Sequence, residues 1–179
     1  MNKAQMEMVG LVVIVIMLTL GMLFLAIFAF KEGTEKKVFT REGLAYSSMS
    51  AVMKTTIDSS VCEGSFRPKI GQELLEDCAQ NHQESPSGFS LYKCNEKHSC
   101  VFLQEIIGEL LQETLGTWNK RYQFRSTLIR SSTSEPEELL NIVSVKGNCP
   151  KTRERDSSGI FPIQVRNAGL IENVLYLCD

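Results

Sequence analysis

Six cysteines and two histidines are the residues of this 179-residue chain that could hold a metal ion or form covalent cross-links. Each histidine follows a cysteine after three intervening residues, His82 after Cys78 and His98 after Cys94, and zinc ligands commonly lie two to four residues apart. Paired zinc cysteines usually share that spacing, whereas five residues separate Cys94 from Cys100. Both histidines lie among polar residues typical of loops, where a solvated imidazole is the ordinary state. We therefore favour disulfides over a zinc site and expect no metal.

The cysteines are even in number, which is typical of disulfide frameworks in small domains of an oxidising compartment. They are Cys62, Cys78, Cys94, Cys100, Cys149 and Cys178. Six cysteines allow 15 pairings, and sequence alone does not select among them. We favour a bond between Cys149 and Cys178, with the other four cysteines pairing among themselves.

Residues able to perform nucleophilic or acid–base catalysis form no recognisable pattern. No serine or cysteine lies in a G-x-S-x-G-type turn, and no glycine-rich phosphate-binding motif occurs. The neighbouring acidic pairs Glu76-Asp77 and Glu137-Glu138 point in different directions, so we expect them to be solvated. The 19 basic and 21 acidic residues give no basis for nucleic-acid binding, which usually needs a clustered basic face. We expect a protein that is not an enzyme, with no cofactor and no nucleic-acid partner.

A membrane anchor is predicted near the N-terminus, where residues 8–30 contain no charged side chain. A helix rises about 1.5 Å per residue, so a run of this length can span a hydrocarbon core of about 30 Å. A secretory signal peptide is the alternative, but its apolar run is about 7–15 residues long and ends at small residues. This run is longer and ends in Phe28-Ala29-Phe30-Lys31. We predict a retained transmembrane helix within residues 1–30 and a head domain over residues 31–179.

The two sides of the anchor differ in charge. Lys3 alone precedes the apolar run, whereas Lys31, Lys36, Lys37 and Arg41 follow it, and the positive-inside rule applied to them predicts a cytoplasmic head. Six cysteines predict the opposite side, because disulfides persist in oxidising compartments. We give the cysteines more weight and expect a single-pass protein of the cell membrane with an extracytoplasmic head.

Helical periodicity dominates the first part of the head. Apolar residues recur at three- and four-residue steps in three segments, residues 31–60, 70–80 and 99–122. Ser99 is a candidate N-terminal cap for the third segment. We expect Trp118, Tyr122 and Phe124 to close the core where helix gives way to strand.

Alternating patterns dominate the second part. Four strands are predicted, over residues 122–129, 139–145, 160–165 and 172–178. Between the second and third of these, Lys151, Arg153 and Arg155 alternate with polar and acidic residues, and we expect a solvated loop there. The fold class is therefore α+β, with a transmembrane helix that continues into a helical region, followed by a small antiparallel sheet of three or four strands.

The leader resembles a known family. Lys3-Ala4-Gln5-Met6-Glu7, followed at once by the apolar run, is similar to the short leaders of archaeal type IV pilin-like proteins. The resemblance covers about the first thirty residues and implies a pilin-like fold. It implies cleavage between Ala4 and Gln5 by a membrane prepilin-type peptidase, so that the mature chain begins at Gln5. It also implies that Glu7 pairs with the amino terminus of an adjacent subunit, although the family's glutamate commonly occupies the fifth mature position and Glu7 would occupy the third.

This resemblance implies a structural subunit of a type IV pilus-like surface filament or secretion apparatus. Its partners would be membrane lipid and other pilin-like subunits, contacted through the N-terminal helix. The alternative is a single-pass, membrane-anchored extracellular binding protein that does not polymerise. Leader processing and recovery in filaments distinguish the two.

Overall fold

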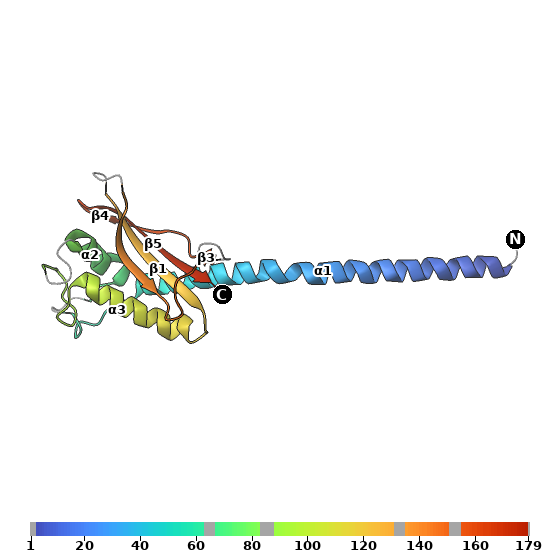
Figure 1. Cartoon of the computed structure of the whole chain (residues 1–179), viewed down its shortest axis with the longest axis horizontal. Coiled ribbons are helices and arrows are strands. Elements are labelled where there is room, and N and C mark those ends of the chain that lie inside the picture. The colour runs from blue at the N-terminus through green and yellow to red at the C-terminus, as the bar shows by residue number, and fades with distance from the viewer. Residues whose placement is uncertain (1–2, 63–66, 83–87, 131–134, 151–154, 179) are drawn as a thin grey trace. The chain divides into compact units, whose positions relative to one another are not determined.

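The computed structural model describes residues 3–62, 67–82, 88–130, 135–150 and 155–178, and for residues 3–9 and 28–39 it describes the backbone alone. Helical elements come first along the chain and strands follow (Figure 1). The helical elements are α1 (Lys3–Lys54), the π-helical turn η1 (Ile70–Leu74), α2 (Leu75–Asn81), α3 (Ser99–Leu111) and the π-helical turn η3 (Gln112–Gly116). The strands are β1 (Arg121–Ile129), β2 (Glu137–Val143), β3 (Arg155–Ser157), β4 (Phe161–Val165) and β5 (Gly169–Cys178). The α+β class, with an N-terminal apolar helix and a small antiparallel sheet, is as predicted.

The chain divides into two compact units between Thr40 and Arg41. The first unit contains the apolar segment, and the second, called the head domain below, contains all the strands. Helix α1 contributes to both units, because its bounds pass through the division.

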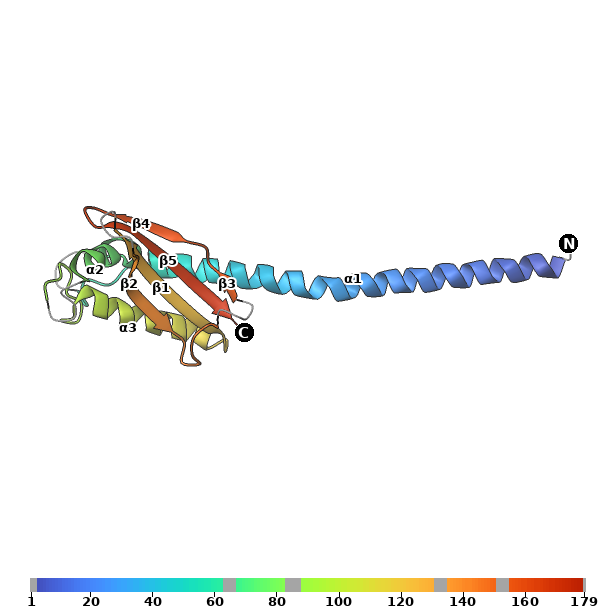
Figure 2. The same ribbon diagram turned by 45° about the horizontal axis from the view of Figure 1, so that its top comes forward.

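The sheet of the head domain is antiparallel throughout its described pairings. Its strand order is β2-β1-β5-β3, and β4 also pairs with β5. Strand β5 pairs with β4 along its first half and with β3 at its C-terminal end (Figure 2). The four predicted strands correspond to β1, β2, β4 and β5, whereas β3 was not expected because three residues are too few to show an alternating pattern.

A bulge lets strand β2 bury two consecutive leucines. The pairing register between β1 and β2 shifts between Ser126 and Thr127, so that Leu139 is an extra residue on β2. Leu139 and Leu140 are both buried, where a regular strand would turn one of them outward.

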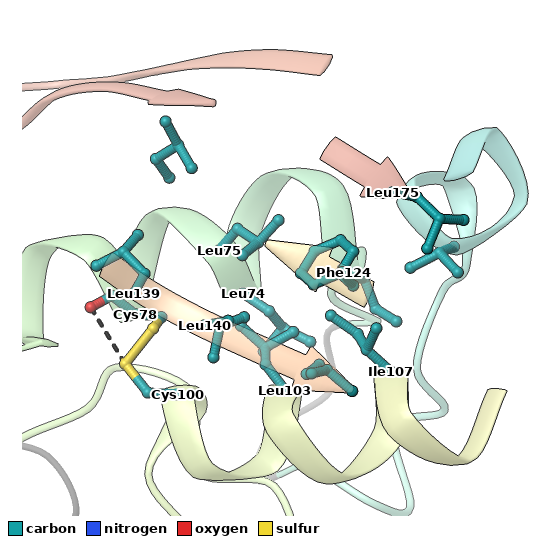
Figure 3. Packing of buried hydrophobic residues seen from close by; sticks show 14 of the residues in the cluster. Leu74, Leu75, Cys78, Cys100, Leu103, Ile107, Phe124, Leu139, Leu140 and Leu175 are labelled. Carbon is teal, nitrogen blue, oxygen red and sulfur yellow. Dashed lines mark hydrogen bonds between the residues drawn. A yellow bond between two sulfur atoms is a disulfide. The ribbon is translucent and has the colours of Figure 1, made fainter. Parts of the chain in front are cut away.

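Helices cover one face of the sheet. Alternate residues of β1 and β5 point to this face, and helices α2 and α3 lie over it (Figure 2). Leu103 and Ile107 of α3 pack with Phe124 of β1 and Leu140 of β2 (Figure 3). Burying one such side chain contributes about 1.5–3 kcal/mol, so the packing of this layer stabilises the head.

The final turns of α1 belong to the same core. Ala45, Met49 and Val52 are buried in one cluster with the helix and sheet residues, at the spacing of one helix face. Gly71 of η1 packs closely against this helix end, because an added Cβ would lie 2.5 Å from the carbonyl oxygen of Met53. The helix predicted within residues 31–60 thus continues to Lys54, and its buried face is present in the final turns.

The third predicted helix is shorter in the structure than expected from the sequence. Its α-helical part ends at Leu111 and the π-helical turn at Gly116, before the expected end at residue 122. Tyr122 and Phe124 are buried as expected, but Trp118 is 63% exposed and does not close the core. Asn119, which follows the end of the π-helical turn, has a left-handed backbone, φ +62°, and this conformation prevents the helix from continuing.

Candidate functional site

The apolar part of α1 is the strongest candidate for a functional segment. Residues Gly10–Ile27 form a helix long and apolar enough to cross a membrane, and none of this window is buried within the protein. Large apolar side chains such as Met17, Met22 and Leu25 are each more than 70% exposed. Because water is a poor solvent for such a surface, it needs lipid, a partner helix or removal as a signal sequence.

The leader residues Ala4, Gln5 and Glu7 lie in the backbone of the same helix, α1. Their side chains are outside the described part of the structure. Cleavage after Ala4 and pairing by Glu7 therefore stay predictions from the sequence.

Disulfides account for all six cysteines of the head domain. The bonds are Cys62–Cys94, Cys78–Cys100 and Cys149–Cys178, and no described cysteine is free. The last is the pairing favoured from the sequence. Within the described residues no three histidine, cysteine, aspartate or glutamate side chains gather in a geometry that could hold a metal ion.

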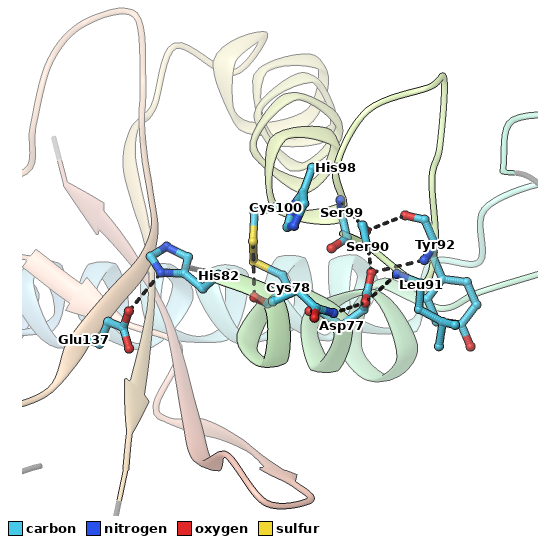
Figure 4. Close-up of a disulfide and its surroundings, with 11 residues drawn as sticks. Asp77, Cys78, His82, Ser90, Leu91, Tyr92, His98, Ser99, Cys100 and Glu137 are labelled. Atoms are coloured by element: carbon cyan, nitrogen blue, oxygen red, sulfur yellow. Dashed lines mark hydrogen bonds and ion pairs between the residues drawn. A yellow bond between two sulfur atoms is a disulfide. The ribbon is translucent and has the colours of Figure 1, made fainter. Parts of the chain in front are cut away.

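A buried polar centre surrounds the Cys78–Cys100 disulfide (Figure 4). Asp77 is only 3% exposed, and its carboxylate accepts hydrogen bonds from Ser90 Oγ at 2.7 Å, Leu91 N at 2.9 Å and Tyr92 N at 3.2 Å. Ser90 Oγ in turn accepts the backbone N–H of Ser99 at 3.0 Å. The network ties α2 to the start of α3, and the expectation that Asp77 is solvated was wrong.

His98 caps helix α3 in place of Ser99. Its Nδ1 accepts the backbone N–H of Cys100 at 3.2 Å, and the residue is 4% exposed. The sequence prediction of a solvated His98 was wrong, because its side chain is buried beside the disulfide although the neighbouring residues in the sequence are polar (Figure 4). The Ser99 hydroxyl, expected to cap the helix, is buried without a hydrogen-bond partner.

This centre is not arranged as a catalytic relay. A serine nucleophile needs a histidine within hydrogen-bond reach of its hydroxyl. In the described network Ser90 bonds to Asp77, whereas the hydrogen bond of His98 goes to its own helix and its Nε2 has no partner. These contacts hold the loop of Ser90–Tyr92 in place, which is a structural task.

His82 and Glu137 connect the end of α2 to the sheet. His82 Nδ1 lies 3.0 Å from Glu137 Oε1, and Arg130 Nε donates to Glu137 Oε2 at 3.0 Å. Burial raises the pKa of Glu137, but the hydrogen bonds from His82 and Arg130 outweigh it and hold the pKa below its usual value. Glu137 and half-buried His82 are therefore paired with each other. The sequence had predicted both side chains to be solvated, and that prediction was wrong.

Two cationic contacts join β3 to its neighbours. Arg41 of α1 lies 2.6 Å from the carboxylate of Asp156, and both side chains are largely buried. The guanidinium of Arg155 lies 4.3 Å from the ring centre of Tyr176 on β5, a cation–π contact. The expected solvated loop is thus a strand at Arg155, while Lys151 and Arg153 lie outside the described residues.

Surface hollows on the head are open and of mixed polarity. One of about 620 Å³ lies beside the β4–β5 turn and is lined by Arg130, Gln164 and Asn167 among others. Another of about 480 Å³ is lined by Tyr46 of α1 and Phe161 of β4 among others, and the centres of these two rings are 5.3 Å apart. Neither holds a convergent set of acid, base and nucleophile among its lining residues.

Fold and site together define a disulfide-bonded α+β head domain whose chain also carries one apolar helix, suited by length and composition to a membrane anchor or a signal sequence. Comparison with protein-family models, curated proteins and solved structures finds no match.

Proposed function

We propose that this chain is a non-enzymatic, pilin-like structural subunit, held in the cell membrane by its apolar helix and able to assemble with similar subunits through that helix. The observation that carries the proposal is helix α1 itself. One helix contains both an unburied apolar window, Gly10–Ile27, and a buried face in the head, formed by Ala45, Met49 and Val52.

A helix that is buried in the head at one end and unburied along its apolar window is suited to a subunit that polymerises. In a membrane or a filament, neighbouring helices replace lipid as packing partners, so shape decides which contacts form. The head adds a rigid domain, because three disulfides and the Asp77 network fix its helices and strands. The described part of the head offers no catalytic constellation to compete with a structural role.

The alternative is an anchored extracellular binding protein that does not polymerise. The outer face of the sheet favours it, since a hollow of about 420 Å³ there is lined by Arg125, Thr127, Glu172 and Tyr176 among others. The two functions share the anchor and differ in whether the N-terminus is processed and whether the helix contacts other subunits.

Intact mass and N-terminal sequence of the protein, taken non-reduced from its native membranes, separate the two functions. We expect a chain that begins at Gln5 and contains three disulfides. A chain that keeps Met1 to Ala4 would leave the non-polymerising anchor as the better description, and cleavage beyond residue 27 would show a signal peptide.

A variant at Glu7 tests assembly itself. Glu7→Ala removes a carboxylate that is costly at a membrane boundary unless paired, so it should leave membrane insertion intact and reduce recovery in filaments. Glu42→Ala, at an exposed position of α1 in the head, is the matched control and should assemble normally. Normal assembly of Glu7→Ala would remove Glu7 from the assembly mechanism.

A further inference from the structure

One end of the head domain gathers basic and exposed apolar side chains that the proposed function does not use. In the strand pairing, Cys178 lies opposite Arg121 of β1 on one side and opposite Arg155 of β3 on the other. Lys146, in the turn after β2, donates from Nζ to the carbonyl oxygen of Asn119 at 3.3 Å, which brings that turn beside the one before β1. We call this end the basic rim, formed by Trp118, Lys120, Arg121, Val145, Lys146 and Arg155.

The apolar side chains of the rim are unusually exposed to solvent. Val145 is 88% exposed and Trp118 is 63% exposed, although large apolar side chains elsewhere in the sheet region are mostly buried. Lys146 is also exposed, and among the acidic side chains described beside the rim, that of Asp156 forms an ion pair with Arg41. A tryptophan and an aliphatic side chain between cations match the chemistry of a membrane interface, where indole lies at headgroup level and lysine or arginine meets phosphate.

The connection between the apolar segment and the head domain is short. The chain enters the head domain at this rim, since Arg41 is the first residue of the domain and its guanidinium pairs with Asp156 of β3. From Ile27, the end of the apolar window, the chain advances 14 residues to Arg41, a length of about 21 Å as helix. The headgroup layer takes up about 5–7 Å of that length, which leaves about 14–16 Å of helix before Arg41.

We propose that the basic rim is a lipid-binding surface that docks the head domain on anionic headgroups of the membrane in which α1 is anchored. Trp118 and Val145 enter the interfacial layer, and Lys146, Arg121 and Arg155 contact phosphate. Docking of this kind holds the head domain at the membrane surface. The inference rests on membrane anchoring but not on polymerisation.

Trp118 supplies the probe, because it is the only tryptophan of the chain. The full-length protein is reconstituted in vesicles of phosphatidylcholine alone and of phosphatidylcholine with phosphatidylglycerol, both containing brominated lipid in both leaflets. We expect the Trp118 emission to shift to shorter wavelength and to be quenched in the anionic vesicles, and to return toward its unquenched level at high salt, since screening weakens exposed charge contacts.

A charge-reversing variant and a matched control localise the contact. Lys146→Glu should lose most of the quenching in anionic vesicles. Lys93→Gln changes an exposed lysine near the other end of α3 and should retain it. Circular dichroism checks that both variants are folded, and the lipid and salt comparisons on the unaltered protein need no variant.

Two results would overturn the proposal. Equal emission and quenching in neutral and anionic vesicles would show that the rim does not bind anionic lipid. A shift to shorter wavelength that grows with the protein-to-lipid ratio and is not quenched by brominated lipid would show that a second copy of the chain covers Trp118. Either result leaves the leader-processing test of the proposed function unaffected.

Discussion

Asp77 is the residue on which the packing of the head's helices most depends. Its buried carboxylate accepts hydrogen bonds from three groups of residues 90–92, and Asn81 Nδ2 adds a fourth at 2.7 Å. A buried charge is tolerated only when its lone pairs are satisfied, and here the backbone supplies two of the donors. The loop thus depends on one side chain of α2.

Replacing Asp77 tests that dependence. Asp77→Ala leaves the Ser90 hydroxyl and two backbone N–H groups without their acceptor, and should lower the free energy of unfolding by about 2–4 kcal/mol. Glu76→Ala, at the partly exposed neighbour, should cost less than about 0.5 kcal/mol. Denaturant titration of the detergent-solubilised protein measures both, and equal losses would mean that the network does not stabilise the head.

Glu137 makes the stability of the head sensitive to acid. Because its folded pKa lies below the usual value, the ionised carboxylate stabilises the fold above the usual glutamate pKa of about 4.3, and this contribution is lost as the pH falls through the lowered pKa. Glu137→Gln should therefore be less stable than the unaltered protein at neutral pH, and the difference should shrink below about pH 4. Melting temperatures across this range measure it, and a constant difference would contradict the role given to the carboxylate.

At the scale of elements, close packing between η1 and the end of α1 is set by one glycine. An added Cβ at Gly71 would lie 2.5 Å from Met53 O and 3.0 Å from Met53 Cα, and neither backbone atom can move cheaply. Gly108 in the middle of α3 is different, because its Cβ would meet only Ile142 Cγ2 at 3.6 Å, an ordinary contact.

The two glycines give a matched pair of variants. Gly71→Ala should destabilise the head by about 1–3 kcal/mol through overpacking. Gly108→Ala should stabilise it by up to about 1 kcal/mol, because alanine is the better helix former. Thermal unfolding of both variants checks the signs, and a stabilising Gly71→Ala would show that η1 does not pack against α1 as described.

The Cys149–Cys178 bond closes the end of the sheet with a sequence separation of 29. Cys149→Ser should leave a single free thiol at Cys178 and lower the free energy of unfolding by about 2–4 kcal/mol. A thiol-specific label followed by peptide mapping identifies the site. Labelling at any cysteine other than Cys178 would show a different connectivity.

Sequence patterns predict a helix or strand well where the pattern is continuous over a long segment. Alternation along residues 122–129 and 172–178 anticipates β1 and β5, whose bounds differ from the prediction by at most three residues. The end of the helical segment was missed because Trp118 continues the apolar period past Gly116, although its side chain is exposed. The apolar character of a residue does not by itself show whether its side chain faces the core or the solvent.

The polar contacts of the head were not predictable in the same way. His82 meets Glu137, which lies 55 residues away along the chain, and Asp77 meets a loop 13 residues away. A polar residue with a distant partner has the same local sequence as a solvated one, so His98 and Asp77 were both assigned to solvent. Knowledge of the fold is needed before such partners can be paired.

At the scale of the whole molecule, the account joins an apolar helix to a rigid head and assigns to the helix the contacts that build a polymer. The apolar window is not buried within the protein, and the core of the head is complete without it. A helix used only to tether the head would fit the same observations. Assembly is therefore the property that distinguishes a polymerising subunit from an anchored protein that does not polymerise.

Recovery of the protein from the surface of cells that naturally make it is the most direct test. Shearing the cells and sedimenting the released material, without reduction, separates filaments from membrane fragments. The account predicts that the chain is found in filaments visible by electron microscopy, with its disulfides intact and its apolar helix protected from protease. A chain found only as monomers in the membrane fraction, under conditions in which the cells make filaments, would contradict it.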